Sequence, residues 1–500
     1  MNYKKFVQCT RSIVSFTVMI AVIMAITGIS EPAAVRAESA SIDTAKIDNL
    51  MDTAMTRLRI PGASLGIVVK GDQLIYQKGY GIAGPENNPV TPQTSFVIGS
   101  VSKSFTAMAI MQLVDQGKID LESPVQNYLP WFQVADAEAS QKIAVKHLLH
   151  QTSGLSTYDG QASLTKGNKP IEQHIRELSR TQLTEPVGTV FQYSNLNYDI
   201  LGGIIEAVSG MTYAEYIEKN IFRPLSMDHS SASPQGSSNL ASGYQPVFGF
   251  MLPTKQLNHE GTVPSGYLIS SAEDMSKYLI AQMNHGRFQN KTIVSEQSAA
   301  LMHQPAAAMW GDQFYAMGWA VDKNINMIYH DGSTENTYSK MIIDGDYGVI
   351  LLINSVDFFH IDSYDQLMVG VNSILHGKEP SINIANPTKT YLIIGFVALA
   401  IIGYIVYSVY GIFVWKSKFK STKLKLVFHV SEILLINLSI PIMILLFLPK
   451  LVVPWSVIFV FLVGLGHFMF FVPMILLVLG VMKTILLTKS IRLYKHVVQA

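Results

Sequence analysis

The 500-residue chain contains a single cysteine, Cys9. This scarcity excludes a disulfide framework and any zinc or iron–sulfur site built from several cysteines. Charged residues are also scarce, at 15% of the chain, whereas hydrophobic residues make up 49%. Ordinary soluble domains carry about 25% charged residues. We therefore expect part of this chain to lie in a membrane.

Basic residues are under-represented in the middle of the chain. Residues 38–385 carry about 12 more acidic than basic residues, although the whole chain has a net charge of +1. Proteins that bind nucleic acid present a basic surface. We therefore expect no nucleic-acid partner.

The N-terminus has the pattern of a secretory signal peptide. Two lysines and an arginine precede an uncharged run over residues 13–29, and Val35-Arg36-Ala37 places small residues where signal peptidase recognises them. We expect cleavage after Ala37, which makes residues 1–37 a signal peptide and exports the chain that follows. The alternative is an uncleaved transmembrane anchor, because the run is at the lower length limit for spanning a bilayer.

The C-terminal part is expected to form a membrane domain over residues 386–500. The composition changes after Asn386-Pro387, and three apolar runs follow that are each long enough for a spanning helix. We place these helices near residues 391–415, 426–448 and 455–482. Pro454 and Pro473 predict that the third run begins late or kinks.

The distribution of lysines predicts the orientation in the membrane. Lysines cluster between the first two runs and after the third, whereas the second connection contains only Lys450. By the positive-inside rule, the first connection and the C-terminus face the cytoplasm, and residues 38–385 lie outside. The second run contains His429, Glu432 and Asn437. We expect His429 and Glu432 to snorkel or pair near the cytoplasmic end, with an intramembrane functional site as the alternative for the three polar groups.

The exported region has strand signals at both ends and helix signals between them. Segments 64–69, 74–80, 327–330, 337–343 and 349–354 indicate strands, with turns at Asp331-Gly332 and Asp344-Gly345 and a closing helix over 363–375. We predict an α/β (α+β) fold, in which an antiparallel sheet is flanked by helices and a helical lobe is inserted between its halves.

Ser100 and Lys103 form the first candidate catalytic pair. They precede the apolar segment 105–113, which indicates a buried helix. Residues i and i+3 share a helix face, so the Lys103 amine would face the Ser100 hydroxyl in a buried setting that lowers the lysine pKa. The Ser-x-x-Lys pattern alone is weak, because it recurs at Ser163–Lys166 and Ser417–Lys420. The alternative role of Ser100 is a helix N-cap.

Two further motifs favour a catalytic site. In the extended segment Tyr193-Ser194-Asn195, the first and third residues face the same side, so a phenol and an amide lie together. In His330-Asp331-Gly332-Ser333 a predicted strand ends on glycine. The amide N–H groups of Ser100 and Ser333 are candidates for an oxyanion hole.

With these three motifs in order, the sequence resembles the serine β-lactamase and penicillin-binding-protein superfamily, in its class C-like branch. The resemblance covers residues 45–376 and includes Pro61-Gly62 and the segment His147–Leu155. It implies that Ser100 is the nucleophile and that Lys103 is its base partner. It also implies that Tyr193 is the acid/base and that Asn195 binds the substrate amide. His330 and Gly332 would lie at the rim of the site, beside Ser333.

One departure from the family pattern bears on the substrate. Where well-known β-lactamases and transpeptidases have a lysine before Thr-Gly or Ser-Gly, this chain has His330 followed by Asp331-Gly332. Lysine offers a permanent positive charge to a substrate carboxylate, whereas histidine is largely neutral at pH 7 unless a neighbour raises its pKa. The resemblance therefore implies acyl transfer without efficient penicillin hydrolysis.

The sequence thus predicts a membrane-anchored, extracytoplasmic serine hydrolase whose partners are a small-molecule or peptide substrate and the lipid bilayer. The expected substrates are D-amino-acid peptides of cell-wall type, with a D,D-carboxypeptidase or D-aminopeptidase-like activity. The alternatives are a β-lactamase or esterase of the same fold, or a non-catalytic penicillin-binding sensor. We expect no cofactor and no metal, because His147 and His150 lack a carboxylate partner. Asp199 and Glu206 are expected on a solvated surface.

Overall fold

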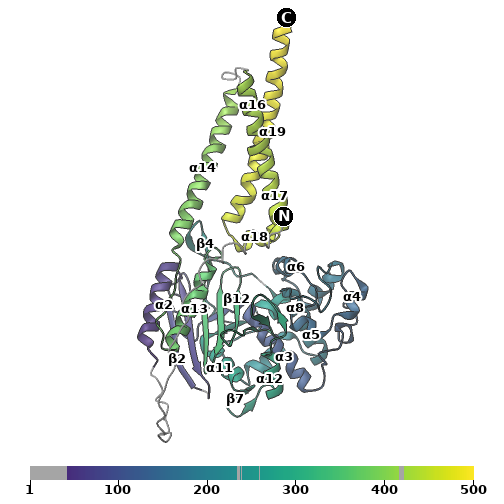
Figure 1. Cartoon of the computed structure of the whole chain (residues 1–500), viewed down its shortest axis with the longest axis vertical. Coiled ribbons are helices and arrows are strands. Elements are labelled where there is room, and N and C mark those ends of the chain that lie inside the picture. Colours follow the sequence, from purple (N-terminus) through teal and green to yellow (C-terminus); the bar gives the residue numbers. More distant parts are fainter. Residues whose placement is uncertain are drawn as a thin grey trace, which may run out of the picture. The chain divides into compact units, whose positions relative to one another are not determined.

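A computed structural model describes residues 42–499, apart from residues 72, 234–236, 238, 258 and 416–421. The predicted signal peptide, residues 1–37, lies outside the described residues. Figure 1 shows an α/β domain that is followed in the chain by long C-terminal helices.

The centre of the α/β domain is an eight-stranded antiparallel sheet with the strand order β2-β1-β14-β13-β12-β11-β10-β9. Its strands are β1 (Gly62–Val69), β2 (Gln73–Gly81), β9 (Ala307–Ala308), β10 (Gln313–Tyr315), β11 (Ala320–Asp322), β12 (Met327–Ser333), β13 (Tyr338–Asp344) and β14 (Tyr347–Ile353). Strands from both ends of the domain meet where β1 pairs with β14, with Ala63 opposite Ile353. The predicted antiparallel sheet is therefore confirmed.

Three short ribbons complete the strands of the described residues. They pair β3 (Ser95–Val97) with β6 (Ile269–Ser271), β4 (Gly243–Val247) with β5 (Phe250–Thr254), and β7 (Arg287–Phe288) with β8 (Lys291–Thr292). The first ribbon precedes the turn that carries Ser100 and therefore helps to hold the start of the site.

Helices flank the sheet and form the inserted lobe (Figure 1). α2 (Thr44–Leu58) packs against α13 (Ile361–Leu375), and α11 (Ala272–Met283) packs against β1 and β14. The remaining helices of the domain are η2 (Gly99–Val101), α3 (Ser102–Asp115), η3 (Val125–Asn127), α4 (Ala137–Lys142), α5 (Val145–Leu149), α6 (Thr157–Ala162), η4 (Ser163–Lys166), α7 (Ile171–Arg176), η5 (Glu177–Arg180), α8 (Asn195–Ser209), α9 (Tyr213–Ile217), η6 (Glu218–Phe222), η7 (Glu260–Thr262), α10 (Val263–Gly266) and α12 (Glu296–Met302).

α3 is the central helix of the core. Each of its residues from Ser102 to Leu113 is buried, and the Phe105 ring stacks on Tyr278 at a centroid distance of 3.8 Å. A helix that is apolar on nearly all sides is stable when protein surrounds it. Burial of the whole helix fixes its first turn, which carries Lys103.

One of the predicted turns is wrong. β12 does not end at Asp331-Gly332 but continues to Ser333. The chain reverses between Thr334 and Thr337, where Thr334 N donates to Thr337 O at 3.0 Å. Gly332 is needed for close packing instead, because a Cβ at this position would lie 2.2 Å from Ile98 O. The glycine therefore lets the strand pass next to the segment that leads to Ser100.

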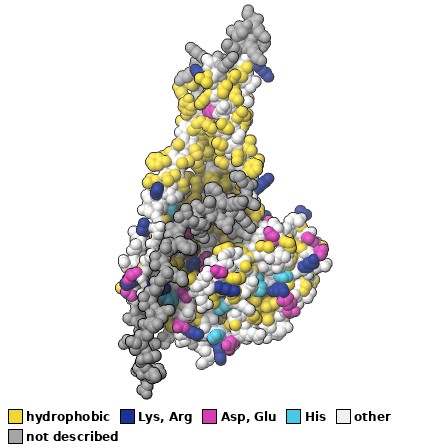
Figure 2. Space-filling view, viewed as in Figure 1, with side chains coloured by type: hydrophobic (Ala, Val, Ile, Leu, Met, Phe, Trp, Pro, Cys, Tyr) yellow, Lys and Arg dark blue, Asp and Glu magenta, His cyan; other side chains and the backbone are white. Residues whose placement is uncertain are grey.

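Among the described residues, three helices are long and apolar enough to cross a membrane. The first is α14 (Pro387–Phe413). The second is continuous through α16 (Lys423–Glu432), the π-helical turn η8 (Ile433–Ser439) and α17 (Ile440–Leu451). Hydrophobic side chains cover much of the surface of the long helices in Figure 2, whereas charged side chains gather on the α/β domain. Such helices suggest a membrane anchor.

The third apolar run does not form one helix near residues 455–482. It forms the short helix α18 (Trp455–Phe461) and the long helix α19 (Leu465–Gln499). Gly464 separates them with a φ of +78°, a left-handed conformation that cannot continue a right-handed helix. The third candidate span therefore begins at Leu465, and α18 is a separate element.

Polar groups of the long helices pair with one another. Lys483 of α19 forms an ion pair with Glu432 at 2.7 Å, and the Tyr404 hydroxyl donates to the same carboxylate at 2.8 Å. His429 Nδ1 lies 3.4 Å from Glu432, and Asn437 donates to a backbone carbonyl of α19 at 3.2 Å. The expected pairing of His429 with Glu432 is confirmed, and Lys483 is a further partner that the sequence did not indicate.

Candidate active site

Ser100 and Lys103 lie at the junction of a 3₁₀ turn and the central helix. Ser100 belongs to η2 and Lys103 to the first turn of α3. Lys103 Nζ is 3.1 Å from Ser100 Oγ, so the i, i+3 spacing brings the two side chains together. Gly99, with a φ of +53°, allows the turn to approach β12, because a Cβ there would lie 2.5 Å from Ser333 N.

The Lys103 side chain is fully buried, at 0% exposure. Its Nζ contacts Ser100 Oγ at 3.1 Å, Asn195 Oδ1 at 2.8 Å and Ser265 O at 2.6 Å. All three partners are neutral. Burial lowers the pKa of Lys103 to about 7, although the negative charge of Asp199 acts in the opposite direction. A large part of the amine is therefore unprotonated near neutral pH.

The three contacts determine the direction of the hydrogen bond to Ser100 in the neutral state. A neutral amine has two N–H groups and one lone pair. The oxygens of Asn195 and Ser265 can only accept, so they receive the two N–H groups and leave the lone pair for the Ser100 hydroxyl. Ser100 then donates to Lys103, which is the geometry that a general base requires.

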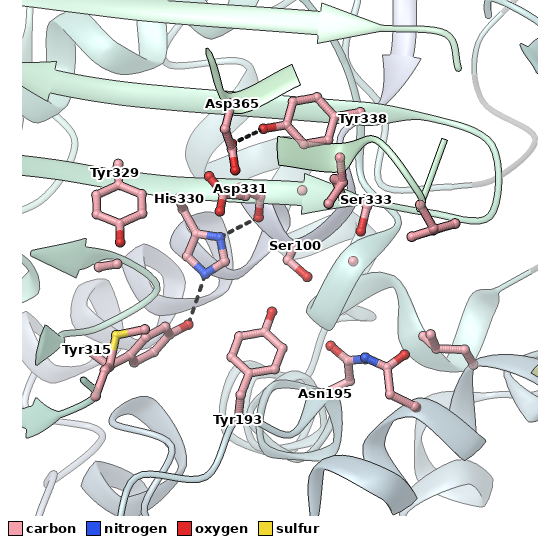
Figure 3. Close-up of a pocket in the computed structure, with 18 of the residues that line it drawn as sticks. Ser100, Tyr193, Asn195, Tyr315, Tyr329, His330, Asp331, Ser333, Tyr338 and Asp365 are labelled. Carbon is pink, nitrogen blue, oxygen red and sulfur yellow. Dashed lines mark hydrogen bonds between the residues drawn. The ribbon is translucent and has the colours of Figure 1, made fainter. Parts of the chain in front are cut away.

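Tyr193 and Asn195 face Ser100 from the other side of the cavity (Figure 3). The Tyr193 hydroxyl points toward Ser100 in this view, and Lys103 Nζ lies 4.7 Å from the Tyr193 ring centroid. Burial raises the pKa of Tyr193 well above its ordinary value, although its hydrogen bond with Ser100 acts in the opposite direction. The phenol is therefore protonated at neutral pH and can donate. Asn195 is the first residue of α8, and its amide group donates to Gly160 O at 3.2 Å.

His330 is held in a neutral state at the opposite rim. Its Nδ1 is 2.6 Å from Asp331 O and its Nε2 is 3.2 Å from the Tyr315 hydroxyl. The carbonyl can only accept, so Nδ1 carries the proton and Nε2 accepts from Tyr315. Burial, together with the charges of Lys103 and Lys340, lowers the pKa of His330 to about 3. No neighbour among the described residues turns this histidine into a cation at neutral pH.

A positive charge does lie near His330, but two carboxylates neutralise it. Lys340 Nζ on β13 pairs with Asp331 at 2.9 Å and with Asp365 at 2.8 Å. Although burial lowers the pKa of Lys340, these two carboxylates raise it above its ordinary value. This edge of the site therefore offers no net positive charge to a substrate carboxylate.

A cavity of about 430 Å³ opens at Ser100. The other predicted site residues that line it are Tyr193, Asn195, His330, Gly332 and Ser333. Lys103 lies beneath the cavity floor and reaches Ser100 from the core. The structure thus brings the candidate residues together from three distant segments of the chain, and Figure 3 shows Ser100, Tyr193, Asn195, His330 and Ser333 around the opening.

Of the two acidic residues expected on a solvated surface, one is buried. Asp199 is fully buried and lies 3.2 Å from His174 Nε2, because this turn of α8 packs against α7. Glu206 is partly buried and accepts a hydrogen bond from Tyr213 N at 2.9 Å. The expectation of a solvated surface is wrong for Asp199, whose charge acts on Lys103 through the core.

No group of three or more His, Cys, Asp and Glu side chains within the described part of the chain is arranged to hold a metal ion. His147 has a structural partner, since its Nδ1 accepts from Ala144 N at 3.0 Å.

Known proteins share both the sequence pattern and the fold. The Beta-lactamase family model matches residues 47–366. Protein flp of Staphylococcus aureus (strain MRSA252) is 29% identical over 318 residues, which cover 62% of this chain and 62% of that protein. The chain therefore spans less than two thirds of the length of this relative. Penicillin-binding protein 4 of Amycolatopsis lactamdurans is 27% identical over 355 residues, which cover 65% of this chain and 90% of that protein.

Solved structures of penicillin-binding-protein homologues and related proteins have a similar fold. The penicillin-binding protein homologue from Pyrococcus abyssi superimposes with a TM-score of 0.60 at 28% identity, over 68% of this chain and 78% of that one. FmtA from Staphylococcus aureus gives a TM-score of 0.56 at 23% identity, over 68% and 91% of the two chains, which concerns the fold alone. The family match covers more than half of the sequence and includes the segments of Ser100, Tyr193 and His330. The chain therefore belongs to the Beta-lactamase family.

Proposed function

We propose that the protein is a membrane-anchored, extracytoplasmic serine hydrolase that forms an acyl-enzyme on Ser100 and releases it to water. The environment of Lys103 Nζ carries this proposal, because its partners among the described residues are a hydroxyl, an amide oxygen and a backbone carbonyl. A buried lysine with neutral partners supplies an unprotonated amine next to the hydroxyl that it must activate.

In the proposed acylation step, Ser100 Oγ attacks the substrate carbonyl carbon and its proton passes to Lys103 Nζ. The amide N–H groups of Ser100 and Ser333 stabilise the negative charge on the carbonyl oxygen. The Tyr193 hydroxyl protonates the leaving atom as its bond to carbon breaks, and the proton held by Lys103 restores the phenol. Water then attacks the acyl-enzyme through the reverse sequence of proton transfers.

We propose that residues 1–37 are a signal peptide, that residues 38–385 form the hydrolase domain and that residues 386–500 form the anchor. The three apolar helices support the anchor. The lysines between the first two helices and after the third support a cytoplasmic C-terminus, which leaves the hydrolase domain outside.

The proposed substrates are D-amino-acid peptides of cell-wall type. Similarity to proteins named penicillin-binding proteins supports this class. The neutral His330 and the paired Lys340 favour a D-aminopeptidase-like reaction over a D,D-carboxypeptidase reaction, because a free terminal carboxylate would find no net positive charge there.

The test is covalent labelling of the full-length protein in detergent, followed by intact-mass spectrometry and peptide mapping. The protein is incubated with a fluorophosphonate and, separately, with benzylpenicillin. We expect a fluorophosphonate adduct on Ser100 that Ser100→Ala abolishes. The matched control is Ser163→Ala, which removes the serine of the second Ser-x-x-Lys pattern and should leave labelling unchanged.

The penicillin arm separates the alternatives. A penicilloyl adduct that persists would indicate a penicillin-binding enzyme or sensor, and one that decays within minutes would indicate a β-lactamase. A fluorophosphonate adduct alone would favour a D-aminopeptidase or an esterase. Labelling that survives in Ser100→Ala, or its complete absence in the unaltered protein, would contradict the proposed acyl-enzyme.

A further inference from the structure

The cavity at Ser100 has a second, apolar wall that the proposed chemistry does not use. Leu164, Met309, Trp310, Phe358 and Phe461 line it. Phe461 is the last residue of α18 and lies outside the family match, which ends at residue 366. The C-terminal part of this chain therefore contributes to the wall of the candidate active site.

Specific contacts hold α18 against the α/β domain. The buried Gln245 side chain donates to Val460 O at 2.9 Å, and the Thr165 hydroxyl donates to Ser456 Oγ at 3.0 Å. The Phe461 ring packs on Phe358 with a centroid distance of 5.6 Å. The Thr165 contact near the start of α18, and the Gln245 hydrogen bond and ring packing at its end, fix the position of Phe461 in the wall.

The loop that carries Phe358 is tied to the first apolar helix in the same way. Asp357 accepts a hydrogen bond from the Tyr391 hydroxyl at 3.0 Å. His360 Nε2 lies 3.1 Å from the Thr390 hydroxyl. Both partners belong to the start of α14, so the apolar wall is fastened to the first candidate span as well as to α18.

The position of α18 in the chain places the wall at the membrane surface. α18 lies in the short connection between the second candidate span, which ends at Leu451, and the third, which begins at Leu465. A segment between two consecutive spans lies on one side of the bilayer, next to its surface. At the start of this connection, Leu451 is 80% exposed and Val452 is 58% exposed, as expected for side chains that face lipid.

We infer that the substrate of Ser100 is anchored in the membrane by an apolar chain. The chain runs from the outer leaflet along Phe461, Phe358 and Trp310, and the reacting carbonyl of the same molecule reaches Ser100. Trp310 is 63% exposed, so the wall presents a large aromatic surface that a bound alkyl chain would cover. This inference rests on the proposed acyl transfer and narrows its substrates to lipid-anchored amides or esters.

The experiment compares two fluorophosphonates with the same reactive group, one with an ethyl chain and one with a dodecyl chain. The full-length protein is reconstituted in lipid nanodiscs, and the rate of Ser100 labelling is followed by intact mass. We expect the dodecyl probe to react at least about ten-fold faster, because several methylene groups are buried along the wall. In Phe461→Ala, the ratio of the dodecyl to the ethyl labelling rate should fall several-fold.

Phe250→Ala is the matched control, because Phe250 is 72% exposed on β5 and is not part of the cavity lining. It should leave both rates unchanged. Partitioning of the dodecyl probe into lipid is the same for all variants, so only a change in preference specific to Phe461→Ala supports the inference. Equal preferences in the unaltered protein and Phe461→Ala would overturn it while leaving the proposed function intact. Failure of both probes to label Ser100 would overturn the proposed function as well.

Discussion

Lys103 in the α/β domain and Lys483 in the long helix α19 are both buried, but their surroundings differ. Lys103 in the α/β domain contacts only neutral oxygens. Lys483 in α19 contacts the Glu432 carboxylate at 2.7 Å and the Ser408 hydroxyl at 3.0 Å. Burial without an anion favours the neutral amine, whereas a carboxylate partner compensates a buried positive charge. Burial alone therefore does not make a lysine reactive; the partners decide whether it serves as a base or as a structural ion pair.

The largest expected effect comes from replacing Lys103. Lys103→Met should slow fluorophosphonate labelling of Ser100 by about 10²- to 10⁴-fold, because the general base is lost. Lys103→Arg should be as slow, since a guanidinium keeps its proton. Lys483→Met should label at the unaltered rate. Rapid labelling of the arginine variant would show that position 103 needs a positive charge and not a base.

Replacing Lys483 should affect stability and leave catalysis intact. Lys483→Met leaves Glu432 without its cation, and loss of one partner of a buried ion pair costs about 3–5 kcal/mol. We expect this loss in the free energy of unfolding in mixed micelles. The double variant Lys483→Met/Glu432→Gln should recover most of it, because no unpaired charge remains. Unchanged stability in the single variant would contradict the structural role of the Lys483–Glu432 ion pair, and with it the proposed difference between Lys483 and Lys103.

The pH dependence of acylation should report on Lys103. Its pKa is about 7, and only the neutral amine accepts the Ser100 proton. The labelling rate should therefore rise with pH, reach half of its maximum near pH 7 and level off above it. His330→Gln should keep this midpoint whatever its effect on the maximal rate, since the pKa of His330 is about 3. A midpoint that moves in this variant would assign the titration to the histidine.

The spacing of residues in the sequence correctly predicted features that are determined within one or two helical turns. The i, i+3 relation between Ser100 and Lys103 lies within one helical turn, and the apolar segment after them predicted the buried helix α3 correctly. Contacts between residues far apart in the chain leave no comparable pattern in the sequence, so they were not predicted. The carbonyl of Ser265, 162 residues away, accepts a hydrogen bond from Lys103. Phe461 reaches the cavity from α18, a short helix between two candidate spans that the hydropathy pattern did not separate from the third apolar run.

The incorrect predictions have a common physical origin. Gly332 looked like a turn residue, yet the structure uses its missing side chain for close packing against Ile98. Asp199 looked like a surface residue, yet it is buried beside His174. A glycine or an aspartate can have several structural roles. Which role it has depends on its neighbours in the folded protein, and the periodicity of the sequence does not reveal these neighbours.

The smallest expected effect tests whether the negative charge of Asp199 shifts the pKa of Lys103. Its negative charge favours the protonated form of Lys103 and so acts against burial. Asp199→Asn removes that charge, so the neutral amine should form at lower pH, and the midpoint of the labelling profile should fall by up to about one unit. The control is Asp274→Asn, which neutralises a buried carboxylate that pairs with Lys277 at 3.0 Å and should leave the midpoint unchanged.

A midpoint that rises in Asp199→Asn would contradict the argument, because removal of a negative charge cannot favour the ammonium form. A fall of the expected size would show that a distant carboxylate sets the working pH of Lys103 without pairing with it, in contrast to the direct contact that Glu432 makes with Lys483.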